Sequence, residues 1–274
     1  MKLYYKIKQL VSHLASYRIP LYAANASFYI FLSAFPAIML VVGILPHIGY
    51  TSDTLLRAMG SVLPEVLMPL VERVVRDMSA NSSGTLLSVT AITALWSASR
   101  GVYCIQLGLN AIHGVRESRN YFFQRFLCIL YTLFLIAALI LTLVIHGFGQ
   151  ELAGYLQRQD VPILRFFAKL LQFRGLILFL LLTVLFTAMF CVLPNRKLSV
   201  RRSVPGAALA ALGWLLFTMF FTVYVRFSGS YSLLYGSLSS IAIGMLWLYI
   251  CISILFYGCV INLLADRRRT EHNS

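Results

Sequence analysis

The chain has 274 residues, of which 59% are hydrophobic and only 12% are charged, and its mean hydropathy is +0.81. Soluble domains are about half apolar and a quarter charged, so this composition excludes a water-soluble globular protein and predicts an all-α membrane protein. The net charge of +14 would indicate nucleic acid as a partner only in a soluble protein. In a membrane protein, Lys and Arg gather in the cytoplasmic loops.

An amphipathic arm comes first, at 1–22, without the apolar core and cleavage site of a signal peptide. Six apolar stretches then follow, each long enough to cross a bilayer as a helix. They lie at 23–46, 86–108, 126–148, 175–194, 205–227 and 238–264. The connections at 54–79 and 161–174 carry apolar residues at helical spacing, which predicts amphipathic helices at the outer surface. A basic tail at 265–274 ends the predicted six-helix bundle.

The distribution of basic residues orients the predicted spans. Fourteen of the 23 Lys and Arg residues fall in the arm, the second and fourth connections and the tail. Eight lie on the other side, including Arg226 at the end of the fifth span, and Arg100 lies inside a span. Because the side richer in Lys and Arg is the cytoplasm, we expect both termini to be cytoplasmic.

No constellation in the sequence predicts an enzyme. The five cysteines and five histidines are dispersed, without the spacing of a metal site. There is no GxxxxGK[ST] phosphate loop, and the six predicted spans lack Asp and Glu, which usually carry proton coupling in transporters. We therefore expect no catalytic residues, no metal and no cofactor, and we set aside a nuclease, which would need clustered carboxylates or histidines.

Arg100 is the position that points most directly to function. It lies about 14 residues into its predicted span, roughly 20 Å from the outer end at 1.5 Å per residue, which is near the middle of the bilayer. A charge at this depth is costly and usually faces a cavity or a partner. Two interpretations stay open: Arg100 binds a phosphate or carboxylate, or it snorkels or binds helix-end carbonyls to lock the bundle.

Several neighbours could share a path with Arg100. Trp96 is four residues away on the same helix face, so a cation–π contact or a common pocket that includes Ser97 is expected. In the first span, Asn25 is a further candidate for the path. Pro36 removes a backbone donor, which predicts a kink or, less readily, a broken helix.

Small residues in the fifth and sixth spans suit packing or gating. Pro205 opens the predicted fifth span, where proline is tolerated in a first turn. Gly206 suits close approach of another helix. Gly236 lies in a polar outer turn, which is either a plain loop or a gate.

Polar residues also gather where the second and sixth spans should reach the cytoplasm. They are Asn110, Glu117, Arg119, Asn262 and Asp266. We expect them to form a cluster that holds these two spans together, with Asn110 also a candidate for the substrate path.

Short motifs occur in order along most of the chain. They are AANASFY at 23–29 with Phe35-Pro36, LWSASRG at 95–101 with Asn110 and Glu117-Ser118-Arg119, VPGA at 204–207 with Trp214, and YGSL at 235–238 with WLY at 247–249, Gly258 and Asn262. The ordered set resembles the YihY/BrkB family of bacterial inner-membrane proteins, formerly labelled ribonuclease BN. The resemblance implies a six-span bundle in the bacterial cytoplasmic membrane, and transport, including movement of lipids or envelope components, rather than the nuclease activity of the older label.

These observations favour a passive or partner-driven conduit for an anionic substrate such as a phospholipid or another envelope lipid. Its expected partners are membrane lipids with anionic headgroups, and not nucleic acid. The alternative is a non-transporting scaffold for envelope assembly, acting with an envelope protein or as a homo-oligomer. A conduit requires a polar cavity that reaches Arg100, whereas a scaffold should pack Arg100 tightly.

Overall fold

The computed structural model describes residues 16–44, 52–60, 67–80, 84–138, 174–196, 198–227 and 237–272. Throughout these ranges the chain forms helices joined by turns, and it contains no strand there. The helices are α2 (Ile19–Ile44), α3 (Ser52–Gly60), α4 (Met68–Ala80), α5 (Gly84–His113), a helix over Tyr121–Ala138, α8 (Arg174–Val192), α9 (Val200–Phe227) and α11 (Ser237–His272). The predicted all-α class is confirmed.

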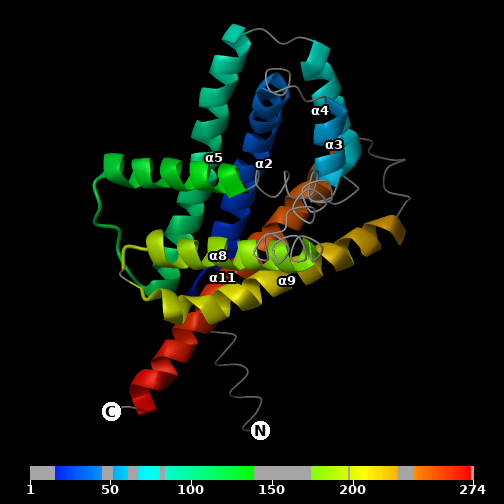
Figure 1. Cartoon of the computed structure of the whole chain (residues 1–274). Coiled ribbons are helices and arrows are strands. Elements are labelled where there is room, and N and C mark those ends of the chain that lie inside the picture. Colours follow the sequence, from blue (N-terminus) through cyan, green and yellow to red (C-terminus); the bar gives the residue numbers. More distant parts are fainter. Residues whose placement is uncertain are drawn as a thin grey trace, which may run out of the picture.

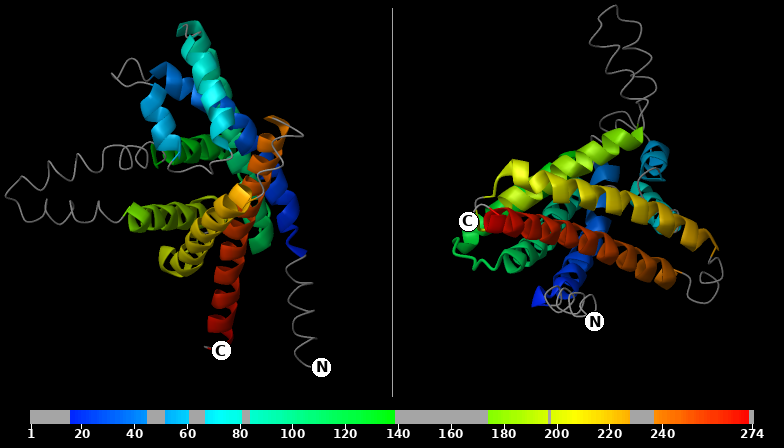
Figure 2. Two further views of the ribbon diagram at one scale, coloured as in Figure 1. Left: turned by 90° about the vertical axis from the view of Figure 1, so that its right-hand side faces the viewer. Right: turned by 90° about the horizontal axis from the view of Figure 1, so that it is seen from below.

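Two pairs of helices and one long connecting helix organise the packing of the described chain. α2 packs along α5, and α8 packs along α9. In Figure 1 the second pair runs across the first at a steep angle. α11 contacts α9 as well as α2 and α5, and Figure 2 shows α8, α9 and α11 side by side. α11 therefore joins the two pairs.

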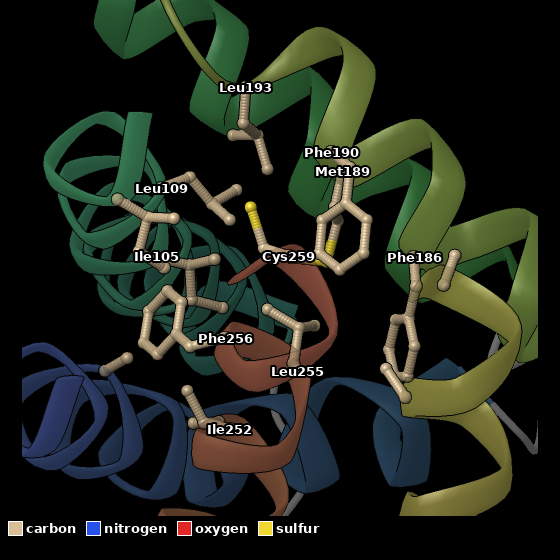
Figure 3. Packing of buried hydrophobic residues seen from close by; sticks show 14 of the residues in the cluster. Ile105, Leu109, Phe186, Met189, Phe190, Leu193, Ile252, Leu255, Phe256 and Cys259 are labelled. Carbon is tan, nitrogen blue, oxygen red and sulfur yellow. The ribbon is translucent and has the colours of Figure 1, made fainter. Parts of the chain in front are cut away.

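The largest buried cluster lies where α5, α8 and α11 meet. Figure 3 shows Leu109 of α5, Phe190 of α8 and Phe256 of α11 pointing into this cluster. Gly108 makes the close approach of α11 feasible, because a Cβ at this position would lie 2.5 Å from Phe256 Cζ. In a membrane, helices associate mainly through such van der Waals packing at small residues.

Four described helices are long and apolar enough to cross a bilayer. They cover Tyr121–Ala138, Gly175–Val192, Val200–Val225 and Ser240–Asp266, and a shorter apolar helix covers Ile19–Ala34. Exposed Phe, Leu, Val and Met side chains cover much of their outer faces. The membrane assignment is confirmed. The predicted span at 86–108 lies within α5, which is not among the four, and the count of six spans stays a prediction.

Helix boundaries differ from the expected ones where polar residues continue a helix. α9 begins at Val200, so Pro205 lies inside the helix instead of opening it. The next helix after α5 begins at Tyr121 instead of 126, and α11 extends through the basic tail to His272. Hydropathy marks the apolar part of a membrane helix, whereas backbone hydrogen bonding continues into the polar residues beyond it.

In the first long connection, 54–79, the described residues form two helices, α3 and α4, where amphipathic helices were predicted. Leu55, Val71 and Val75 bury their side chains together between them, which accounts for the amphipathic pattern. α2 continues through Pro36 as one helix. The arm up to residue 15, the connection at 161–173 and Gly236 lie outside the described residues.

Candidate functional site

Arg100 lies near the middle of α5, as the seventeenth of its 30 residues. Its side chain is exposed, and its Cζ lies 5.9 Å from the centroid of the Tyr29 ring on α2. Among the described residues, Arg100 forms no ion pair. The structure thus matches neither expected extreme: Arg100 is not packed tightly inside the bundle, and it projects from an exposed face of the helix.

Trp96 contacts a different arginine from the one expected. Arg125, near the start of the helix over Tyr121–Ala138, places its Cζ 4.2 Å from the centroid of the Trp96 ring. Arg125 Nη2 also donates a hydrogen bond to the Trp96 carbonyl oxygen at 3.2 Å. Spacing along α5 predicted a partner one turn away, and only the crossing of a second helix brings Arg125 there.

The remaining candidates on α2 and α5 lie around these two arginines. Asn25 is exposed and precedes Tyr29 by one turn, so the two residues share a face of α2. Ser97 is half-buried. We call the surface formed by Asn25, Tyr29, Trp96, Arg100 and Arg125 the arginine face. It offers two guanidinium groups, each beside an aromatic ring, and this arrangement suits binding of an anion.

The end of α5 is built around Glu117. Gly114, with φ of 64°, ends the helix: its N–H bonds the Ala111 carbonyl at 3.1 Å, and the Val115 N–H bonds the Asn110 carbonyl at 2.9 Å. This pair of bonds is the Schellman motif, which glycine favours. The motif turns the chain back along α5 and brings the Glu117 carboxylate against the helix.

Two amides, one turn apart on α5, then donate to Glu117. Its Oε2 accepts from Asn110 Nδ2 at 2.9 Å and from Gln106 Nε2 at 3.0 Å. Its Oε1 accepts from the Arg119 backbone N–H at 3.1 Å, and Arg119 Nε lies 4.0 Å away. A carboxylate with this many donors is held firmly in place.

The same network reaches the end of α8. Arg119 Nη1 and Nη2 donate to the carbonyls of Leu193 at 3.2 Å and Pro194 at 2.9 Å. Asn195 donates its backbone N–H to Asn110 Oδ1 at 2.8 Å. We call the set formed by Gln106, Asn110, Glu117, Arg119 and Asn195 the Glu117 network. It fastens α5 to the chain that follows α8.

Asn262 of α11 belongs to a separate contact, with α9. Its Oδ1 accepts from the Gly206 N–H at 2.7 Å, and its Nδ2 donates to the Ser203 carbonyl at 2.8 Å. Pro205, between them, has no N–H to give to its own helix. A Cβ on Gly206 would collide with the Gly258 carbonyl oxygen, so glycine is required for this approach. Asn262 therefore joins α11 to the helical turn that Pro205 weakens.

α5 and α11 meet through residues that sequence reasoning did not propose. His113 Nε2 and Cys259 Sγ lie 3.4 Å apart, beside a pocket of about 10 Å³ that Arg202 and Asp266 also line, which is room for one water molecule. Burial, and after it the positive charge of Arg196, lower the pKa of His113 from 6.5 to about 4, while the Asp266 carboxylate acts in the opposite direction. The ring is therefore neutral near pH 7.

The expected single cluster of polar residues is thus two clusters. Glu117, Arg119 and Asn110 join α5 to the end of α8, and Asn262 joins α11 to α9. The sequence carried signals for two of the missed residues. Gln106 stands four residues before Asn110 in an apolar stretch, and Asn195 follows Pro194 in a turn. Arg125 carried no such signal, because it was used only in the count of basic residues that orients the predicted spans.

Comparisons with known proteins agree with the resemblance of the motifs. The family model described as Virulence factor BrkB matches residues 10–274. The chain is 31% identical over 248 residues, 90% of each chain, to a Bacillus subtilis protein named ribonuclease-like protein YfkH. A UPF0761 membrane protein of Actinobacillus pleuropneumoniae is 24% identical over 263 residues, 93% of this chain and 91% of its own.

A UPF0761 membrane protein of Aggregatibacter aphrophilus is 28% identical over 199 residues, 71% of this chain and 67% of its own. No solved structure matches the chain. The family model covers nearly the whole sequence, and four described helices have the length and apolar composition of membrane spans. The chain is therefore an integral membrane protein of the BrkB family.

Proposed function

We propose that the protein is a passive or partner-driven conduit for an anionic lipid in the bacterial inner membrane, with both termini in the cytoplasm. In this proposal α5 is one of six spans and the arginine face is the path of the headgroup. The chain carries no catalysis, and its partners are membrane lipids, with an envelope protein as a further partner if the movement is driven.

The observation that carries the proposal is Arg100 in the middle of α5, which is exposed and has no ion-pair partner among the described residues. A charge at the centre of a bilayer costs about 2.5–3.5 kcal/mol on insertion scales. The contact with Tyr29 offsets roughly 0.5–1 kcal/mol of this cost, and the described residues supply no carboxylate. An anionic headgroup would supply the missing negative charge.

The exposure of Arg100 also favours one kind of path. Large apolar side chains next to the arginine face, Phe28 and Ile92, are 49% and 70% exposed. A headgroup can therefore contact Arg100 while its acyl chains stay against apolar side chains. This arrangement does not require the closed polar cavity that we expected of a conduit.

The test is transbilayer movement of headgroup-labelled lipids in liposomes that contain the purified protein. Anionic lipid should move faster than in protein-free vesicles, and Arg100→Gln should slow it by about tenfold, since one lost charged hydrogen bond is worth about 1.5 kcal/mol or more. Arg201→Gln is the matched control, because it removes one exposed arginine at the start of α9.

Wild-type movement no faster than in protein-free vesicles would sink the conduit. That result would favour the non-transporting scaffold for envelope assembly. Equal slowing by Arg100→Gln and Arg201→Gln would assign the effect to overall charge instead of to the arginine face.

A further inference from the structure

We propose that Arg100 and Arg125 together bind the terminal phosphate monoester of a lipid, in preference to the phosphodiester of common phospholipids. The inference rests on the proposed function, because it names the headgroup class that the conduit takes. Its test measures binding, so it does not depend on whether movement occurs.

Both arginines lie at one turn of α5: Arg100 belongs to that helix, and Arg125 reaches it from the helix over Tyr121–Ala138. In an α-helix, the Trp96 carbonyl is the acceptor for the N–H of Arg100, four residues later. Arg125 Nη2 lies 3.2 Å from that same carbonyl oxygen. Since a helical N–H···O bond spans about 2.9–3.0 Å, Arg125 Nη2 is within about 6 Å of the Arg100 backbone nitrogen.

The position of Arg100, four residues after Trp96, favours a side chain on the same face of α5 as this turn. Long side chains on a helix lean toward its N-terminus and cover the preceding turn, which here is the turn of Trp96. Tyr29 lies beside one guanidinium and Trp96 beside the other. Tyr29 and Trp96 thus place both guanidinium groups around the same part of α5, and in this proposal a single ligand on the arginine face contacts both.

Neither guanidinium is neutralised by the described part of the chain. The ion pairs there involve Arg76, Arg119 and Arg202. Arg125 Nε is a buried donor without an acceptor, and a turn of its guanidinium toward a phosphate would satisfy it. Two like charges that repel each other in a poorly polar environment favour one ligand that attracts both.

The charge and shape of that ligand follow from the pair. A phosphate monoester carries about −1.5 to −2 at pH 7, because its second pKa is near 6. Its three unesterified oxygens can accept from both guanidinium forks. A phosphodiester carries a single negative charge and offers two such oxygens, so it neutralises only one of the two arginines.

A lipid is the source that fits the surroundings of this site. Phe28 and Ile92 are exposed next to the arginines, and Phe126, adjacent to Arg125 in sequence, is 61% exposed. These side chains suit acyl chains and offer nothing to a soluble phosphate.

The experiment compares lipids retained by the full-length protein in detergent, by native mass spectrometry, with equal amounts of phosphatidic acid and phosphatidylglycerol. The first has a phosphate monoester and the second a phosphodiester on the same acyl chains. Wild type should retain phosphatidic acid about tenfold better, a difference of about 1.4 kcal/mol. Arg100→Gln and Arg125→Gln should each bring the ratio close to one, and Arg201→Gln should leave it unchanged.

A wild-type ratio near one overturns the proposal, as does an equal loss in Arg201→Gln. Arg125→Lys keeps the charge and removes the guanidinium fork, so it should lower the ratio several-fold even if Arg125→Gln does not fold; an unchanged ratio in the lysine variant also overturns it. Displacement of phosphatidic acid by an equal concentration of glycerol 3-phosphate would overturn the assignment to a lipid.

The binding and movement assays separate the two proposals. A preference for phosphatidic acid without transbilayer movement removes the conduit and leaves the phosphate site. Movement of anionic lipid without that preference leaves the conduit and removes the monoester site.

Discussion

The charged residues at the end of α5 have many hydrogen-bond partners within the protein, whereas the arginine in the middle of α5 has few among the described residues. At the end, Glu117 accepts three hydrogen bonds, and Arg119 donates to two carbonyls beyond α8. In the middle, Arg100 is exposed, and among the described residues it lies beside the Tyr29 ring and pairs with no carboxylate. Charged groups that form their hydrogen bonds within the protein stabilise the fold. A charged group without such partners is available to a ligand. We therefore expect a structural role for the Glu117 network, and the proposed function places a ligand on the arginine face.

The largest effect on stability should come from Glu117→Ala. The change leaves Gln106, Asn110 and Arg119 without their shared acceptor, and hydrogen bonds to a charged group contribute about 1.5–3 kcal/mol each. The thermal midpoint in detergent should fall accordingly. Glu72→Ala is the matched control, because Glu72 pairs with Arg76 at 3.8 Å on an exposed helix face, where such a pair contributes about 0–1 kcal/mol.

If both glutamate variants lower the midpoint equally, the Glu117 network contributes no more to stability than an exposed ion pair does. A charge swap sharpens the point further. Glu117→Arg combined with Arg119→Glu should restore stability only in part, because Arg119 also donates to the Leu193 and Pro194 carbonyls, and a glutamate cannot donate to them.

Asn262→Ala should have the next largest effect. It leaves the Gly206 N–H and the Ser203 carbonyl without partners in a buried contact, and an unsatisfied buried group costs about 1–3 kcal/mol. The midpoint of thermal unfolding is again the measurement. Asn25→Ala, an exposed amide on α2, should leave that midpoint unchanged, and an equal loss in both variants would contradict the role of Asn262.

Arg100→Leu should change stability in the opposite direction, and less. The substitution removes a charge without a described ion-pair partner, so the free energy of unfolding should stay the same or rise by about 0.5 kcal/mol at most, the range of single exposed changes. Lipid movement should slow in the same variant. A loss of stability as large as that of Glu117→Ala would show that Arg100 is structural and would remove the contrast between the two regions.

The smallest effect concerns pH and His113. Its pKa is lowered by burial, and further by Arg196, from 6.5 to about 4 in the folded protein, so the unfolded chain binds more protons between these values. Stability should therefore fall as the pH drops from about 6.5 toward 4. The half-buried position of the ring keeps the change modest. His113→Gln should flatten this part of the stability curve, and an unchanged slope would contradict the assignment.

Sequence reasoning identified the membrane class, the family and most helices of the described chain, because these depend on long apolar stretches and on ordered motifs. It placed Arg100 correctly within a long helix. It missed Arg125 as a neighbour of Trp96, since the two residues are 29 positions apart in sequence and meet only where two helices cross. It also joined Asn262 to the wrong helix, because shared depth in a membrane does not specify which helices touch.

The amino-acid sequence by itself determined that the chain is a helical membrane protein of the BrkB family, through composition, apolar length and motifs. Which charges are satisfied was decided only by the tertiary structure. The sequence alone does not distinguish Glu117 from Arg100, because each is a charged residue in or beside the same predicted span. The Schellman turn at Gly114 brings Glu117 back onto two amides of α5, while no described carboxylate folds onto Arg100. Hydrogen-bond partners distant in sequence are a property of the packed chain, and they separate the structural end of α5 from its proposed site.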